Sequence, residues 1–462
     1  MSVETILNIL DRAHTGPFCT VHDWDAKIIP SKVKEKLKEH GVEKTCTPQD
    51  PINADDGLVD EYFKAGFELA VDVGMLCLDT ERVVKVTDTE LKEVIRNAPS
   101  ELPMGEGRDK IRITHRRPED RHPPIQTCPL GIVVSEDLFI PLVQAIAQYR
   151  IIDLLEGPSL ETVYGRPIRS GTPYETLAGR VQASMHKEAV WRAGRPGMGF
   201  DEVITSPTVF GQFGGYGVPG GFDPKRHAAL ILSPSELKTS YTSLHKVVHA
   251  INCGGFIFSG TFVLIGGYAG PPEGAALVSV ASNMLQFAVH QASYASSPIM
   301  DMRYMGNCGR EAQWANSVAY QALSRNTHLL TGAVTNQVAG PCTSMILYES
   351  TVGMMNLSVS GVSISVGPRS AGGKYTNYIS PLECKYVAEV FKGCAGMKRS
   401  DANEIAKAII PKYGDKLRYP PKGKSFRECF DLETLKPTKE WRDIYLKVKK
   451  EVMDLGVPLE YP

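Results

Sequence analysis

The sequence predicts an α/β protein whose main domain is a closed (β/α)₈ (TIM) barrel, with an N-terminal helical extension and extra C-terminal helices. From about residue 125, short apolar or β-branched runs alternate with longer segments of helical periodicity. Such repeated strand–helix units imply a parallel sheet, and about eight of them over some 270 residues match a closed barrel. No G-x-G-x-x-G turn follows the first strand, which disfavours the alternative of an open, doubly wound sheet.

The individual elements follow from periodicity and capping residues. Residues 1–124 are expected to form the helical extension, because apolar residues recur at helical spacing in 58–70 and 87–95 and Thr87 is a favourable N-cap. Residues 125–400 are expected to form the barrel and 401–462 a C-terminal helical segment. The expected strands are 131–134, 202–205, 228–232, 256–258, 262–265, 300–304, 329–334 and 362–366. The expected barrel helices are 173–193, 236–252, 273–296, 310–326, 341–357 and 381–393.

Composition excludes several classes of protein. The 462 residues carry 51 Lys and Arg against 52 Asp and Glu, so the net charge is −1. This balance is typical of a globular protein and lacks the basic excess of a nucleic-acid binder. The charge is unevenly distributed, since residues 250–348 contain only six charged side chains. Because unpaired charge is rarely buried, this stretch is expected to form core, active-site wall or a subunit interface.

The N-terminal sequence and the cysteines indicate a cytoplasmic protein. The first residues lack the basic and apolar regions of a signal peptide, and the ten cysteines are scattered without a CxxC pair. Free thiols of this kind are typical of a reducing compartment. Residues 274–300 contain no Asp, Glu, Lys or Arg, but their many Ser, Asn, Gln and His side chains would be costly in a membrane. We therefore expect a buried core helix there and no membrane association.

In a barrel of this kind, catalytic residues lie on the loops that follow the strands. The rule nominates five segments: 201–206, 259–260, 304–308, 335–337 and 367–370. Asp201 and Glu202 follow a turn rich in Gly and Pro and are candidates for acid–base catalysis; the alternative is that they are exposed turn acids. The glycine-rich segment 211–221 is either a flexible surface loop or a cover for the site.

One pattern has the spacing of a metal site. His245, His249 and Cys253 are spaced four residues apart on one side of an expected helix, and Glu236 is a conceivable further ligand. The alternative is that the two histidines merely flank the apolar face of the helix. Zinc is thus one interpretation without further support in the sequence, and His249 is also a candidate catalytic donor.

Longer segments carry a resemblance to a known family. The most specific of these segments are Ala193-Gly-Arg-Pro-Gly-Met-Gly199, Gly266-Gly-Tyr-Ala-Gly270, Ala339-Gly-Pro-Cys-Thr343 and Gly423-Lys-Ser-Phe-Arg-Glu-Cys429, and Gly107-Arg-Asp109 is a shorter one. Through them the chain resembles, along nearly its whole length, the monomethylamine methyltransferases of methanogenic archaea. The resemblance implies a TIM barrel that forms homo-oligomers and passes a methyl group to the cobalt of a separate corrinoid protein.

The chain departs from the family at the expected amine site. Where the family has pyrrolysine, whose electrophilic imine is thought to capture the amine, this chain has Asp201. A site glutamate of the family falls on Gly260 and a site glutamine on Val334, while Glu236 is a possible replacement for the remaining glutamate. These changes imply that methylamine is not the substrate and that the pocket accepts a bulkier molecule.

The resulting expectation is an O-demethylase that transfers a methyl group from a methoxylated aromatic compound to Co(I), since a phenolate leaves readily. No corrinoid is expected to be tightly bound, because the D-x-H-x-x-G signature is absent from the sequence. Two alternatives remain: a methyltransferase for a quaternary or other methylated amine, and an inactive scaffold homologue. The expected catalytic residues are Asp201, Glu202 and His249; the expected substrate-binding residues are Phe200, Phe213, Tyr216, Gly260, Tyr268, Tyr304, Val334 and Gln337.

Overall fold

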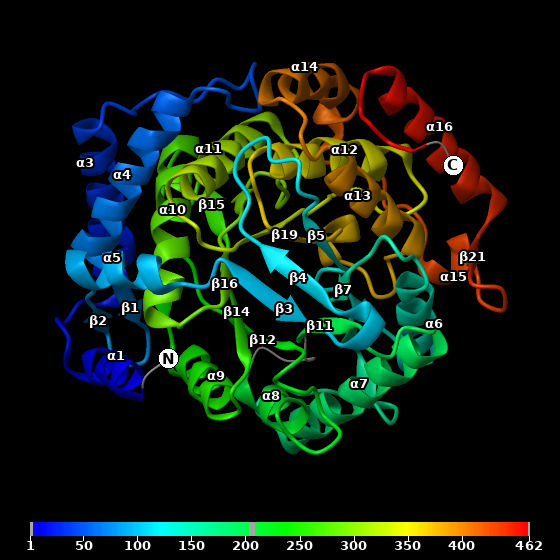
Figure 1. The fold of residues 1–462 in the computed structure, drawn as a ribbon, viewed down its shortest axis with the longest axis horizontal. Helices are drawn as coiled ribbons and strands as arrows, with labels where there is room; N and C mark the ends of the chain where they lie inside the picture. Colours follow the sequence, from blue (N-terminus) through cyan, green and yellow to red (C-terminus); the bar gives the residue numbers. More distant parts are fainter. Residues whose placement is uncertain (1–2, 203–207, 461–462) are drawn as a thin grey trace.

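A closed barrel of eight parallel strands lies at the centre of the chain, and the computed structural model describes residues 3–202 and 208–460 (Figure 1). The strands follow one another around the barrel in chain order, and the last pairs with the first to close it. This arrangement confirms the predicted (β/α)₈ fold. The barrel strands are β5 (Ile125–Cys128), β7 (Leu154–Leu155), β11 (Gly199–Glu202), β12 (Ala228–Leu232), β14 (Phe256–Gly260), β16 (Tyr294–Ser296), β18 (Thr331–Val334) and β19 (Ile364–Val366).

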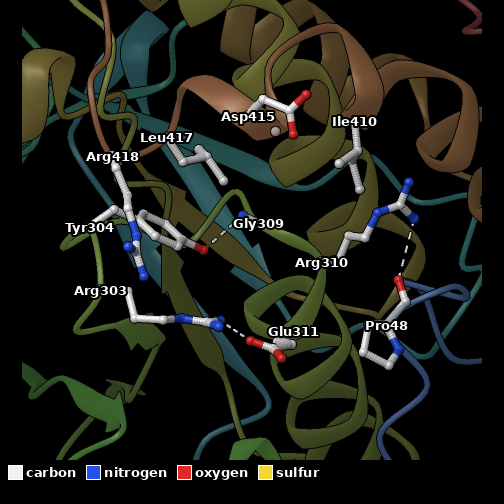
Figure 2. A pocket seen from close by; sticks show the side chains of 11 residues that line it. Pro48, Arg303, Tyr304, Gly309, Arg310, Glu311, Ile410, Asp415, Leu417 and Arg418 are labelled. Carbon is white, nitrogen blue, oxygen red and sulfur yellow. Dashed lines mark hydrogen bonds and ion pairs between the residues drawn. The ribbon is translucent and has the colours of Figure 1, made fainter.

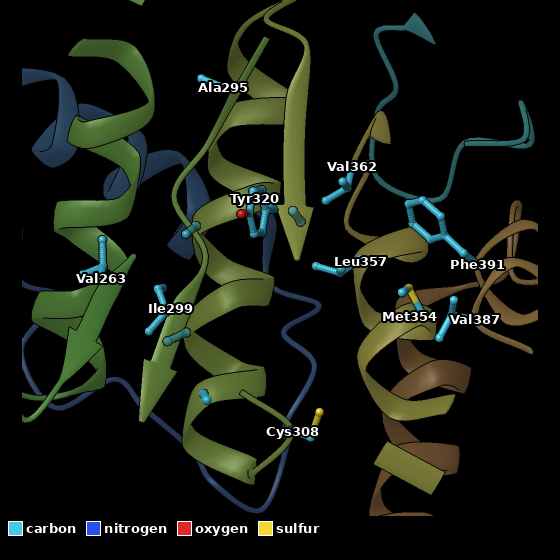
Figure 3. Close-up of a cluster of buried hydrophobic side chains, with 14 of the residues drawn as sticks. Val263, Ala295, Ile299, Cys308, Tyr320, Met354, Leu357, Val362, Val387 and Phe391 are labelled. Carbon is cyan, nitrogen blue, oxygen red and sulfur yellow. The ribbon is translucent and has the colours of Figure 1, made fainter. Parts of the chain in front are cut away.

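Helices cover the outside of the barrel, as the alternating pattern predicts. Figure 3 shows part of the apolar layer beneath them, in which Tyr320, Leu357 and Phe391 come from three successive helices. All three side chains are buried, so this layer is a dry core between strands and helices. The covering helices are α6 (Glu136–Ala147), α7 (Pro173–Arg192), α8 (Val209–Gly215), α9 (Tyr241–Asn252), α10 (Pro272–Val289), α11 (Arg310–Asn326), α12 (Ser344–Val359) and α13 (Pro381–Gly393).

Helix α10 explains the charge-free stretch of the sequence. Every residue from Glu273 to Val289 is buried, because α10 contacts α3 (Ile29–Glu39), α4 (Asp56–Val73) and α5 (Asp88–Asn97) of the N-terminal region as well as its barrel neighbours (Figure 1). A helix covered on all sides has no solvated face on which charge would be favourable. Within residues 3–202 and 208–460, no helix combines the length and the apolar character that crossing a bilayer requires.

A β-hairpin closes the amino-terminal end of the barrel. Strands β3 (Glu101–Met104) and β4 (Ile111–Thr114) pair in antiparallel fashion and cross the centre of the view in Figure 1. Leu102, Met104 and Ile113 join the cluster of apolar side chains inside the barrel. The sequence prediction of a mostly helical N-terminal region did not include this hairpin, because four-residue strands are too short for their alternation to stand out.

The predicted strand positions need correction in several places. Residues 131–134 contain only β6 (Val133–Val134), which pairs with β8 (Ser159–Leu160) outside the barrel. Residues 262–265 and 300–304 contain β15 (Val263–Ile265) and β17 (Ile299–Asp301), which form a separate parallel pair beyond the ends of β14 and β16. The barrel strands β5, β7 and β16 were not predicted, and the predicted helix 273–296 ends at Val289. Strands of two to four residues inside longer apolar runs give no separate periodic signal.

The remaining elements lie around the barrel. At the C-terminus, α14 (Arg399–Ile409) and α16 (Lys439–Asp454) pack on α12. Thr87 caps α5 in a full capping box, as its position predicts. The other elements are α1 (Val3–Thr15), α2 (Val21–Asp23), η1 (Trp24–Ile28), β1 (Met75–Cys77), β2 (Arg82–Val84), η2 (Gly107–Asp109), β9 (Thr162–Val163), β10 (Arg166–Pro167), β13 (Lys238–Thr239), η3 (Ser370–Gly373), η4 (Ile410–Lys412), η5 (Gly414–Lys416), α15 (Phe426–Cys429), β20 (Phe430–Asp431) and β21 (Lys436–Pro437).

Candidate active site

A cavity of about 930 Å³ opens at the carboxyl ends of the barrel strands. Its wall includes Leu232, Gly260, Ser296 and Val334 at the ends of four strands, while Glu156 and Arg369 follow β7 and β19. This is the end of a (β/α)₈ barrel at which catalytic groups gather. The remaining wall is largely apolar, with Leu130, Ile168, Leu230, Phe258 and Phe262 among its residues. A mostly apolar cavity with a few converging polar groups is typical of a small-molecule site.

Two buried carboxyl groups belong to this end of the barrel. Asp201 is fully buried and Glu156 is 2% exposed. The Tyr294 hydroxyl donates a hydrogen bond to Oδ1 of Asp201, and the Thr127 hydroxyl lies close enough to act on its pKa. Oε2 of Glu156 has no hydrogen-bond partner among the described residues. Such an unsatisfied buried polar atom is uncommon and is a natural place for a ligand to bind.

Burial controls the protonation of this carboxyl pair. Loss of hydration raises the pKa of Asp201 to about 7, while Tyr294 and Thr127 act in the opposite direction. Burial also raises the pKa of Glu156 well above its ordinary value, and the charge of Asp201 raises it further, whereas Arg369 opposes the shift. Burial thus favours the protonated form of both carboxyl groups, and a cation bound beside them would favour the ionised form.

Tyr294 is held in place as a hydrogen-bond donor to Asp201. Its ring stacks on that of Phe258, with 4.6 Å between ring centroids and an interplanar angle of 7°. Burial and the neighbouring carboxyl groups raise the pKa of the Tyr294 phenol, so it keeps its proton. Because Phe258 lines the cavity, this stack connects the cavity wall to Asp201 beneath it.

Arg369 is the one basic side chain that the loop after β19 contributes to the cavity. Its backbone nitrogen donates to Oε1 of Gln337 across 3.1 Å and to the Thr335 carbonyl across 3.2 Å. Gln337 is itself fixed by a 3.1 Å hydrogen bond from Nε2 to the Ser350 hydroxyl. The sequence nominated the segment 367–370, but no local pattern identified Arg369 itself. Gln337, expected to bind substrate, is instead placed to orient the Arg369 backbone.

The sequence-predicted site residues fall into separate groups in the structure. Asp201, Gly260 and Val334 lie in or beside the cavity, whose wall includes the latter two. Phe200 lies outside the strand layer, with its ring 5.1 Å from that of Phe222. Tyr216 is also buried there, and its hydroxyl donates to the His227 carbonyl across 3.1 Å. Neither residue lines the cavity. Phe200 points outward because successive side chains of a barrel strand alternate between interior and exterior, and Tyr216 lies at the end of α8, outside the strands.

Three further aromatic residues also lie away from the cavity. Phe213 and Tyr268 are 37% and 50% exposed at the surface. Tyr304 lines a different cavity of about 450 Å³, shown in Figure 2, and its hydroxyl accepts a 3.1 Å hydrogen bond from the Gly309 nitrogen. Figure 2 also shows Arg303 paired with Glu311 across this second cavity. The side chain of Glu202 lies outside the described residues.

The candidate metal ligands are not assembled into a site. Nε2 of His249 lies 3.0 Å from the Tyr216 carbonyl and 3.9 Å from Sγ of Cys253, whereas His245 is exposed. Glu236 follows β12 on another segment, where Oε1 accepts a 3.4 Å hydrogen bond from the Leu264 nitrogen. Within the described ranges, no group of three or more His, Cys, Asp or Glu side chains is arranged to hold a metal ion. His249 does not line the cavity either.

Comparison with known proteins identifies the family. The family model for "Monomethylamine methyltransferase MtmB" matches residues 4–457. A relative of that name from Methanosarcina mazei is 31% identical and MtmB1 from Methanosarcina acetivorans is 32% identical, each over 97% of both chains.

Solved structures support the same family assignment. The crystal structure of the Methanosarcina barkeri monomethylamine methyltransferase superposes with a TM-score of 0.94 at 30% identity, covering 99% of this chain and 98% of the other. A hydroxylamine complex of MtmB gives the same TM-score of 0.94. These relatives are named for an amine, so the expectation of a methoxylated aromatic substrate and of O-demethylase activity is wrong. The chain belongs to the monomethylamine methyltransferase family.

Proposed function

We propose that this protein transfers a methyl group from a methylated amine to the cobalt of a corrinoid carried by a separate protein. Membership of the family over nearly the whole chain supports methyl transfer. The observation that carries the choice of an amine is the buried carboxyl pair, Glu156 and Asp201, at the catalytic end of the barrel. An ammonium ion is the partner that such acids favour in an apolar cavity.

The charge on the substrate nitrogen decides whether the reaction is feasible. Co(I) supplies the electron pair for the new bond to the methyl carbon and is formally oxidised to Co(III). The carbon–nitrogen bond breaks with its electron pair left on nitrogen, so an ammonium departs as a neutral amine. A neutral donor would have to leave as an amide anion, a far poorer leaving group. Asp201 and Glu156 favour the cationic form of the donor by their negative charge.

Asp201 occupies the position at which the resemblance places pyrrolysine. A carboxylate holds an ammonium by charge and hydrogen bonding rather than by a covalent bond. The Tyr294 hydroxyl keeps Oδ1 of Asp201 in one orientation, which reduces the entropy lost when the donor binds. Orientation matters because the methyl carbon must face the opening of the cavity, from which the cobalt of the partner protein approaches.

The cavity is larger than methylamine requires. Methylamine has only two non-hydrogen atoms, whereas the cavity measures about 930 Å³. Gly260 adds to this space, since a Cβ built there would meet Leu232 only at 3.4 Å and the Ser296 carbonyl at 3.9 Å. We therefore include amines with larger substituents, in particular tertiary and quaternary ones, in the proposal.

The test is methylation of Co(I) cobalamin or of the partner corrinoid protein, followed by visible spectroscopy. The donors are methylamine, dimethylamine, trimethylamine and tetramethylammonium, and at least one is expected to give enzyme-dependent methylation. A variant of the exposed His245, His245→Ala, serves as the control and should methylate at the wild-type rate. Methylation only from neutral donors such as methanol or an aryl methyl ether would contradict the proposal. Binding of the corrinoid protein without turnover of any donor would favour a scaffold role.

A further inference from the structure

We infer that the methylated amine also carries a carboxylate, which Arg369 binds, so that the substrate class is the zwitterionic N-methylated amino acids. The inference rests on the proposed function and names the substrate class of the same cavity. It comes from a feature that a simple alkylamine leaves unused, namely the Arg369 guanidinium in the wall of a cavity whose lining is mostly apolar.

Arg369 is partly buried, and the protein leaves part of its guanidinium group unsatisfied. Its Nε has no hydrogen-bond partner among the described residues. Burial lowers the pKa of Arg369, and only the charge of Glu156 acts in the opposite direction. A guanidinium removed from water is costly unless an anion and hydrogen-bond acceptors compensate it. A carboxylate of the substrate would supply both.

The residues around Arg369 restrict the position of its guanidinium group. A Cβ on Gly373 would lie 2.5 Å from Nε and 2.9 Å from Nη2, so only glycine permits this close approach. A Cβ built on Gly131, which also lines the cavity, would lie 3.9 Å from the same Nε. Together with the Gln337 contact to the Arg369 backbone, this packing restricts the guanidinium plane. A fixed guanidinium matches a carboxylate by two parallel hydrogen bonds.

The cavity therefore combines opposite charges with an apolar lining. Glu156 in the wall and Asp201 beneath it suit an ammonium group, and Arg369 in the wall suits a carboxylate. Leu230 and Phe258 in the wall suit the methyl groups on nitrogen. The wall also includes Lys246 and Glu161, so side chains of both charges line the cavity. An amine without a carboxylate would leave Nε of Arg369 without a hydrogen-bond partner among the described residues.

The first experiment compares donors in matched pairs that differ only in the carboxylate. Glycine betaine is paired with propyltrimethylammonium, and N-methylglycine with N-methylpropylamine. With the wild-type protein and its corrinoid acceptor, we expect kcat/KM to be on the order of 100-fold higher for the donor that carries the carboxylate. A factor of this size is typical of a contact made of two charge-assisted hydrogen bonds. If both members react equally well, the inference about the carboxylate fails while the proposed amine function stands. If no member of either pair reacts, and no simple methylamine does, the proposed function itself fails.

The second experiment assigns the preference to Arg369. In Arg369→Gln the ratio of kcat/KM between the acid and its matched amine should fall to near one, and Arg369→Lys should retain part of it. The ratio does not depend on how much of the variant is folded, because both donors are tested on the same preparation. Arg418→Gln, which removes an exposed arginine at the second cavity, should keep the wild-type ratio. A ratio that stays high in Arg369→Gln would overturn the role of Arg369.

Discussion

The Tyr294 hydroxyl donates a hydrogen bond to Oδ1 of Asp201 inside the barrel, and both side chains are fully buried. The two residues lie on β16 and β11, which are not neighbours in the barrel. The contact therefore spans the interior and fixes the carboxylate from one side only. Oδ2 of Asp201 has no hydrogen-bond partner among the described residues, and Asp201 lies beneath the cavity wall that Phe258 forms. This relationship is the basis for the first predictions.

Replacing Asp201 by Asn should lower kcat/KM for the best methylated amine by well over tenfold. The amide still accepts the Tyr294 hydrogen bond but cannot neutralise a cation, so the fold is retained while binding is lost. Initial rates of corrinoid methylation measure the effect. Asp401→Asn, on the exposed first turn of α14, is the control and should match the wild type. An unchanged rate in Asp201→Asn would remove this carboxylate from the site.

The dependence of catalysis on pH should report the same carboxylate. Because burial raises the pKa of Asp201 to about 7, the cation-binding form becomes populated only as the pH rises through that value. With tetramethylammonium, whose charge does not titrate, kcat/KM should increase tenfold per pH unit below about 7 and then level off. The rise should be absent in Asp201→Asn. A flat wild-type profile between pH 5 and 8 would show that the ionisation of Asp201 does not control binding.

The contribution of Asp201 to the stability of the protein should fall as the pH rises from about 4 to about 7. Asp201 binds its proton more tightly when folded than when unfolded, so the folded state holds the extra proton in this range and loses that advantage at higher pH. The buried carboxyl groups of Glu236, Glu349 and Glu383, with pKa values of about 7, 8 and 7, act in the same direction.

The contribution of Asp201 can be isolated by comparison with its amide variant. Urea unfolding midpoints at pH 5 and pH 8 should differ less in Asp201→Asn than in the wild type, since the variant has no proton to lose at this position. Equal differences in the two proteins would mean that Asp201 is not desolvated in the folded state.

Gly260 should control the size of the donor. A Cβ at this position would stand 3.4 Å from Cδ2 of Leu232, which is ordinary contact, so Gly260→Ala should fold normally. The two extra methyl groups of Gly260→Val would fill cavity space near Leu232 and Ser296. The kcat/KM ratio of tetramethylammonium to methylamine should therefore fall about tenfold in Gly260→Val, the usual discrimination for one or two methyl groups. A ratio equal to that of the wild type would show that donors do not approach Gly260.

Asp109 should be important for stability rather than for catalysis. Its Oδ1 accepts a 2.9 Å hydrogen bond from Nε of Arg195, and both side chains are almost fully buried. Asp109→Ala would leave the Arg195 guanidinium without its carboxylate, so the free energy of unfolding should fall by about 3–5 kcal/mol. The control is Arg112→Ala, which breaks an exposed pair with Glu101 and should cost about 1 kcal/mol or less. Similar losses from both variants would contradict this assignment.

The same ion pair explains two of the sequence segments that resemble the family. Asp109 ends the segment 107–109 and Arg195 lies in the segment 193–199, and these two segments meet beneath the barrel strands. Likewise, the backbone nitrogen of Lys424 donates a 2.9 Å hydrogen bond to the Pro341 carbonyl, which joins the segments 423–429 and 339–343. Their shared role is to hold distant parts of the chain together, a relationship that linear spacing does not express.

The sequence alone determined the fold class and the longer elements. Helices α7, α11 and α13 agree with the predicted ranges within one residue, because periodicity, proline and capping residues act locally. The tertiary structure decided which short segments became barrel strands, and it brought Glu156, Tyr294 and Arg369 together from three distant parts of the chain. Strand pairing and the loss of water around a charge depend on what surrounds a residue in space. For that reason only the folded barrel reveals the buried acid pair and the arginine that faces it.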